Sequence, residues 1–267
     1  MKTIKSVIVI LLFVLASCTE EDTYARVGGN HLHLKNSAKE LFWFSGIHNS
    51  DPNHRMFKDV LREFKHFSPD CVLVEGGNNI PSSSRDEAIL HGGEPRYVAF
   101  LAYNDNIPVF DIEPPINSQL EYLSQKYDSD KILAMYIIRQ LYQKQREYQD
   151  NQVRIDLYGY VSGFIEKNNL SGNKTITNEK LQELFKLYFP QEANDSPWYE
   201  WNFGEIIYFN KEPNIINEIW KETARFRDDY AVNLIQEMSM KYDKIFVMMG
   251  SDHIRNQEKR LREIYNN

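Results

Sequence analysis

KIFVMMGSDH, residues 244–253, joins an apolar run to a polar turn and decides the fold. Lys244 to Met249 has the length and composition of a strand in a sheet that helices cover. Gly250 to His253 then gives the spacing Gly-x-x-His, and a helical pattern follows from Arg255 to Tyr265. A strand that passes through a glycine turn into a helix is the unit from which α/β sheets are built.

Three earlier apolar runs repeat this arrangement, at residues 41–45, 71–74 and 108–112. Apolar residues at helical spacing lie between them, at residues 56–67 and 97–103. Alternating strands and helices predict an α/β fold, with a central, largely parallel or mixed sheet flanked by helices.

The middle of the chain, from about residue 117 to about 201, has helical patterns rich in tyrosine and glutamine. Helical spacing continues through residues 215–240, before the last strand returns to the sheet. We therefore predict one domain over residues 39–267, with a helical insertion at about 117–201.

Each predicted strand ends in a histidine or a carboxylate. His48 follows the first strand, Glu75 ends the second, Asp111 and Glu113 end the third, and His253 follows the fourth. Ligands of open α/β sheets bind at the carboxyl ends of the strands, where the loops converge. The sequence therefore predicts that these side chains share one site.

Two histidines and a glutamate are ligands that suit a divalent metal ion with a water in its open position. His48, Glu75 and His253 are thus the candidate metal ligands. Such an ion lowers the pKa of its water and polarises a scissile carbonyl, and Asp111 or Glu113 could then serve as general base. The sequence leaves the identity of the metal open.

Four segments occur in an order that resembles the TraB/PrgY/GumN and Tiki group. They are Ser45–His48, Val-Leu-Val-Glu-Gly at 72–76, Phe-Arg-Asp-Asp-Tyr at 226–230, and Gly250–His253. The resemblance covers about residues 41–260 and extends to a wider superfamily with erythromycin esterases and the haem-uptake ChaN-like proteins.

This resemblance implies an α/β domain in which two Gly-x-x-His motifs and a glutamate form one site, proposed in Tiki for metal-dependent peptide hydrolysis. The matching positions are His48, Glu75 and His253. Arg227 matches the arginine of the group's Glu-Arg-Asp segment, where it would stabilise a developing oxyanion.

The chain departs from the group's pattern at several positions, which leaves the subfamily and the substrate open. Ser45 and Gly46 stand where the first motif usually has Gly and Thr, and Phe226 stands where the Glu-Arg-Asp segment has Glu. Arg255 and Asn256 stand where a glycine often follows the second histidine.

Structural interpretations compete at several residues. Arg227 shares a helix with Arg225, Asp228 and Asp229 and could belong to a solvated charged face. A helix dipole alone would favour a carboxylate at Glu94.

Metal-dependent hydrolysis of a peptide or ester bond is the main functional hypothesis. The alternative is a non-catalytic lipoprotein that binds a peptide or haem in the same cleft, with His54 beside His48 for haem.

The N-terminal segment has the features of a secretory signal. Lys2 and Lys5 precede an apolar run at residues 7–15 that is too short to span a membrane. Leu15 to Cys18 resembles the lipobox of bacterial lipoproteins, in which the cysteine is acylated. We expect a signal peptide at residues 1–17 and a lipidated tether at 18–38. The protein would then be a lipoprotein of the cell envelope, in the outer membrane and with the cell surface as one option.

The composition limits the partners of the chain. A formal net charge of −7 without a basic block argues against nucleic acid and against electrostatic binding to anionic lipid. We therefore expect the lipid on Cys18 to attach the protein to the membrane. We expect the site to bind a peptide or a small molecule.

We expect Cys18→Ser to release the protein from the membrane fraction of the producing cells without unfolding the domain. Cys71 is the remaining cysteine, so the substitution removes no intramolecular disulfide. Fractionation with immunoblotting measures the release. A Cys18→Ser variant that stays in the membrane fraction at the normal level contradicts acylation as the anchor.

Overall fold

The computed structural model describes residues 31–76, 80–151, 157–170, 176–190, 198, 201–203 and 214–266. The expected signal peptide and Cys18 lie outside these residues. Within them, none of the helices combines the length and the apolar composition that crossing a bilayer requires.

The fold is α/β, as predicted, with a mixed five-stranded sheet in the order β1-β2-β5-β3-β4. β1 (Leu32–Lys35) runs antiparallel to β2 (Glu40–Gly46). The pairs β2 with β5 (Lys244–Gly250), β5 with β3 (Cys71–Val74) and β3 with β4 (Val109–Asp111) are parallel. The last strand of the sequence is therefore the central strand of the sheet.

β1 corrects one predicted boundary. The tether was expected to extend to residue 38, but Leu32 and Leu34 of β1 are buried against the sheet. The backbone N–H and C=O groups of β1 pair with those of β2. In a tether, the same groups would be solvated by water. The folded domain thus includes residues 31–38.

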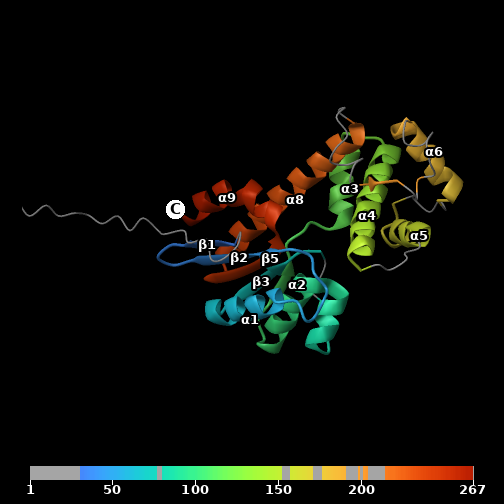
Figure 1. The fold of residues 1–267 in the computed structure, drawn as a ribbon. Helices are drawn as coiled ribbons and strands as arrows, with labels where there is room; N and C mark the ends of the chain where they lie inside the picture. The colour runs from blue at the N-terminus through green and yellow to red at the C-terminus, as the bar shows by residue number, and fades with distance from the viewer. Residues whose placement is uncertain are drawn as a thin grey trace, which may run out of the picture.

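Helices cover both faces of the sheet (Figure 1). α1 (Met56–Phe67) and α2 (Arg85–Asn104) pack on one face, against Phe246 and Met248 of β5. α8 (Ile215–Ser239) and α9 (Ser251–Tyr265) pack on the other, against Val247 and Met249. Burial on both faces explains why the segment 244–249 is an unbroken apolar run.

The described residues from 116 to 203 contain helices and no strand. The helices are α3 (Ile116–Ser124), α4 (Ser129–Asn151), α5 (Leu157–Lys167) and α6 (Asn178–Tyr188). They enclose a separate apolar core that includes Phe185 and Trp198.

α8 belongs to both cores. Ile216 and Ile219, near its start, pack in the core of the helical unit, whereas Val232 and Ile235 pack against the sheet. Its middle turns therefore pass the carboxyl edge of the sheet, where Arg227 and Asp228 are buried.

α2 is kinked at Gly93, which has φ 58° and ψ −145°. A Cβ atom at this position would lie 2.8 Å from the backbone oxygen of Asn49, in the loop after β2. The kink thus lets the helix backbone touch that loop.

We expect Gly93→Ala to lower the free energy of unfolding by about 1–3 kcal/mol or more. This backbone conformation is unfavourable for alanine, and its methyl group would clash with the Asn49 carbonyl. Urea unfolding followed by circular dichroism measures the change. Gly163→Ala is the matched control. Gly163 lies in α5 with nothing within 4 Å of its Cβ position, so alanine should be neutral or stabilise by up to about 1 kcal/mol. Equal effects of the two substitutions would contradict the prediction.

Candidate functional site

The carboxyl ends of β2, β5 and β3 lie side by side because these strands are parallel. Gly46 pairs with Gly250, and Val74 pairs with Met248, two positions earlier on β5. The loops that follow β2 and β3 and the first turn of α9 therefore meet over the end of the central strand.

Gly250 marks the point where three predicted site residues converge. A Cβ atom placed on it would lie 3.5 Å from Nε2 of His48, 3.7 Å from Oε2 of Glu75 and 3.8 Å from Cδ2 of His253. These are ordinary van der Waals distances, so the three side chains surround one small space.

His253 is held by a buried carboxylate. Its Nδ1 lies 2.5 Å from Oδ1 of Asp228. Burial would raise the pKa of Asp228, but hydrogen bonds, led by that with His253, lower it below its ordinary value. An ionised carboxylate can only accept hydrogen bonds, so Nδ1 carries the proton and donates it. When only Nδ1 carries a proton, Nε2 is free of one and can act as a base.

Asp228 itself is fixed by two amide side chains from α9. Asn256 donates to Oδ2 at 3.1 Å, and Gln257 donates to Oδ1 at 2.9 Å. Asp228 therefore ties α8 to α9 and also sets the direction of the His253 ring.

Glu75 directly follows β3 and is engaged on both carboxylate oxygens. Oε2 accepts the N–H of Gly250 at 2.8 Å, and Oε1 lies 3.4 Å from the guanidinium of Arg227. Burial would raise the pKa of Glu75, but nearby positive charge, led by Arg227, lowers it below its ordinary value. Glu75 is thus an ionised group that holds the start of α9 in place.

Arg227 is buried and also forms an ion pair with Glu113. Glu113 in turn accepts the N–H of Gly76 at 3.1 Å. The geometry therefore favours a supporting role for Glu113, which holds Arg227 and the loop after β3, over the predicted role of general base. Arg227 does not lie on a solvated charged face.

Asp111 is placed apart from this group. It ends β4, one strand beyond β3, where it pairs with Val74. Burial and the charge of Asp111 together raise the pKa of Tyr103 on α2, which places the Asp111 side chain near that helix. Its partner Val74 packs on the side of the sheet that α2 covers, whereas Glu75 faces Arg227 of α8.

The donors as arranged do not fit a resident metal ion. In the part of the chain that the structure describes, no three or more His, Cys, Asp or Glu side chains are grouped to hold one. Both oxygens of Glu75 are engaged, and the charge of Arg227 beside them opposes a second cation. The divalent ion therefore stays a prediction.

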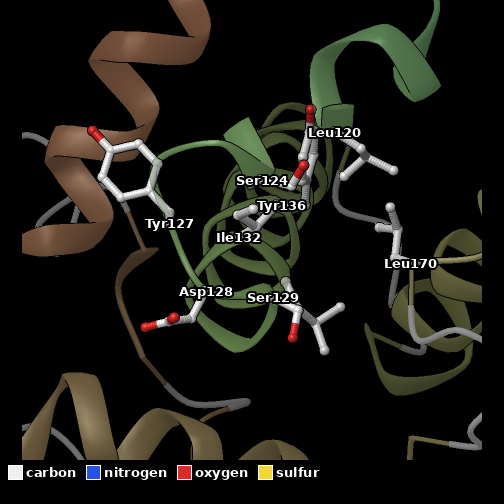
Figure 2. A pocket seen from close by; sticks show the side chains of 9 residues that line it. Leu120, Ser124, Tyr127, Asp128, Ser129, Ile132, Tyr136 and Leu170 are labelled. Carbon is white, nitrogen blue, oxygen red and sulfur yellow. The ribbon is translucent and has the colours of Figure 1, made fainter. Parts of the chain in front are cut away.

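His54 and the pocket in the helical unit give little support to a haem site. Nδ1 of His54 lies 3.3 Å from the backbone nitrogen of Met56, at the start of α1. A pocket of about 410 Å³ lies in the helical unit, where Figure 2 shows side chains such as Tyr127, Ser129 and Leu170 around it. None of the candidate site residues lines this pocket.

Two residues near the site were not among the predicted site residues. Asp228 was read as part of a charged face, and Glu94 as a residue favoured by a helix dipole. Both are buried, with exposed fractions of 8% and 1%. A sequence signal for Asp228 existed, because it directly follows Arg227 in the segment that resembles the Glu-Arg-Asp motif.

Comparisons of the chain with protein-family models, with curated proteins and with solved structures find no match. The resemblance to the TraB/PrgY/GumN and Tiki group therefore stays a prediction.

We expect Asp228→Asn to destabilise the fold most at neutral pH. The folded-state pKa of Asp228 is lowered, so its contribution is present above the ordinary value of 3.8 and is lost as the pH falls through the folded value. The difference in unfolding free energy between wild type and variant should therefore shrink between about pH 6 and about pH 3. Urea unfolding at several pH values measures it.

Asp229→Asn is the matched control for this measurement. Asp229 is the next residue of α8, but it is exposed and pairs with Arg260 at the surface. Its loss should change stability by less than about 1 kcal/mol at any pH. A pH-independent difference for Asp228→Asn would contradict the assignment of an ionised Asp228.

Proposed function

We propose that this chain is a hydrolase that cleaves a peptide or ester bond, with His253 as the general base that activates water. The observation that supports this proposal most directly is the pair of His253 with the buried carboxylate of Asp228. The pair leaves Nε2 available on a ring that borders the same small space as His48 and Glu75. A carboxylate-bound imidazole beside a second polar side chain is suited to proton transfer.

In the proposed reaction, one proton moves twice. Nε2 of His253 takes a proton from water as the water oxygen bonds to the carbonyl carbon of the substrate. Asp228 stabilises the imidazolium that forms. The imidazolium then gives the proton to the leaving nitrogen or oxygen as its bond to the carbonyl carbon breaks. The products are a carboxylic acid and an amine or alcohol.

The other side chains of the site support these steps. His48 is exposed and borders the same space, so it can donate a hydrogen bond to the carbonyl oxygen as negative charge develops there. Glu75 accepts the N–H of Gly250 and so holds the start of α9, the helix that carries His253. Arg227 keeps Glu75 and Glu113 in place, a role that fits its contacts better than a direct bond to the oxyanion.

The sequence predicted a divalent ion on His48, Glu75 and His253 for the same reaction, and chelation distinguishes that hypothesis from the His253 route. From the segment that resembles a lipobox, we also propose that the activity belongs to a lipoprotein of the cell envelope. Its substrate would then be a peptide or ester outside the cytoplasm.

We expect His253→Ala and His48→Ala each to lower kcat/KM by about 100-fold or more on a substrate from a panel of peptides and aryl esters. The double variant should lose little more than the worse single variant, because the two side chains act on one transition state. His66→Ala is the control, since His66 is exposed on α1 and away from the site. Wild-type activity in His48→Ala and His253→Ala would exclude this site.

The same assay after exhaustive chelation tests the metal. Full activity after chelation, with no metal in the purified protein, supports the His253 route. Loss of activity that added divalent metal restores would replace it with the metal-dependent route. Saturable binding of a peptide without turnover, abolished by His48→Ala, would favour the non-catalytic alternative.

A further inference from the structure

The loop after β2 holds His48 in an unusual backbone conformation. His48 has φ 60°, in the left-handed region that residues with a Cβ atom rarely adopt. Its side chain is exposed, so packing around the ring does not fix it. The position of Nε2 beside Gly250 must therefore be set through the backbone of the loop.

Glu94 supplies contacts that can do this. Its Oε1 accepts the N–H of Ile47 at 2.8 Å, and its Oε2 accepts the N–H of Asn49 at 3.1 Å. These amides flank His48 on both sides, and the exposed fraction of Glu94 is 1%. One buried carboxylate thus accepts hydrogen bonds from the backbone on both sides of the histidine.

The local sequence places Glu94 for this contact. The kink at Gly93 interrupts α2, and Pro95 follows Glu94 as the helix resumes. The close approach of Gly93 to Asn49 brings the helix backbone against the loop. A carboxylate favoured only by the helix dipole would remain in water, whereas both oxygens of Glu94 are buried and bound to another segment.

We propose that Glu94 is the positioning residue that fixes the His48 imidazole in the site, by binding the amides on both sides of it. The effect of Glu94 on turnover rests on the proposed function. Its effect on the position of the His48 ring does not. Glu94 touches no reacting atom and acts through His48.

Glu94→Gln tests the proposal with little change in shape. A glutamine side chain has one carbonyl oxygen, and its NH₂ group cannot accept a hydrogen bond, so one of the two amides loses its partner. Glu87→Gln is the matched control, because Glu87 is also on α2 and accepts the backbone N–H of Ser83, away from the site.

The first measurement is nuclear magnetic resonance and needs no substrate. In the wild type, the amides of Ile47 and Asn49 should exchange slowly, and the His48 ring should give a nuclear Overhauser contact with Gly250. Glu94→Gln should speed exchange of these amides and weaken the contact, while the amides of β5 and the Glu87→Gln protein stay unchanged. Fast exchange at both amides in the wild type overturns the proposal even if Glu94→Gln does not fold.

The second measurement is activity. Glu94→Gln should lower kcat by up to about 100-fold and change KM less, since a displaced catalytic group costs rate more than affinity. Combined with His48→Ala, it should cause no further loss. A further loss in that background, or unchanged activity where His48→Ala is impaired, overturns the positioning role. If the wild type turns over no substrate, the proposed function fails, and the resonance measurements alone decide the role of Glu94.

Discussion

The burial of β5 on both faces is the constraint on which the rest of this structure depends. A central strand of a sheet needs apolar side chains toward both helical layers, and the segment 244–249 supplies them. β5 has β2 on one side and β3 on the other. The residues that follow β2 and β3 and the first turn of α9 therefore meet at Gly250.

The two histidines of the site are held by different means. The ring of His253 is fixed directly, through a hydrogen bond between its Nδ1 and the carboxylate of Asp228. His48 is fixed through the backbone, by the two amides that Glu94 accepts. In both cases a buried carboxylate from a helix reaches to the carboxyl edge of the sheet, so the geometry of the site depends on how α2 and α8 pack.

This difference explains what the sequence could predict. The strands other than β1 were predictable because they are continuous apolar runs, and His48, Glu75 and His253 because they lie within three residues of the ends of such strands. Asp228 and Asp229 are adjacent and chemically identical, and tertiary packing decides which of them is buried. Glu94 acts on a loop that lies about 45 residues earlier in the chain, a pairing that no local pattern records. β1 was assigned to the tether because residues 19–38 are largely polar and show no sustained periodic pattern.

The antiparallel course of β1 determines where the chain enters the domain. Leu32 lies opposite Trp43, and Nδ1 of His31 accepts the N–H of Ser45, so the start of β1 is beside the carboxyl end of β2. The described part of the chain thus begins at the edge that carries His48. If an acylated Cys18 holds the protein, as the sequence predicts, the linker would join the domain at the edge of the sheet that carries the site.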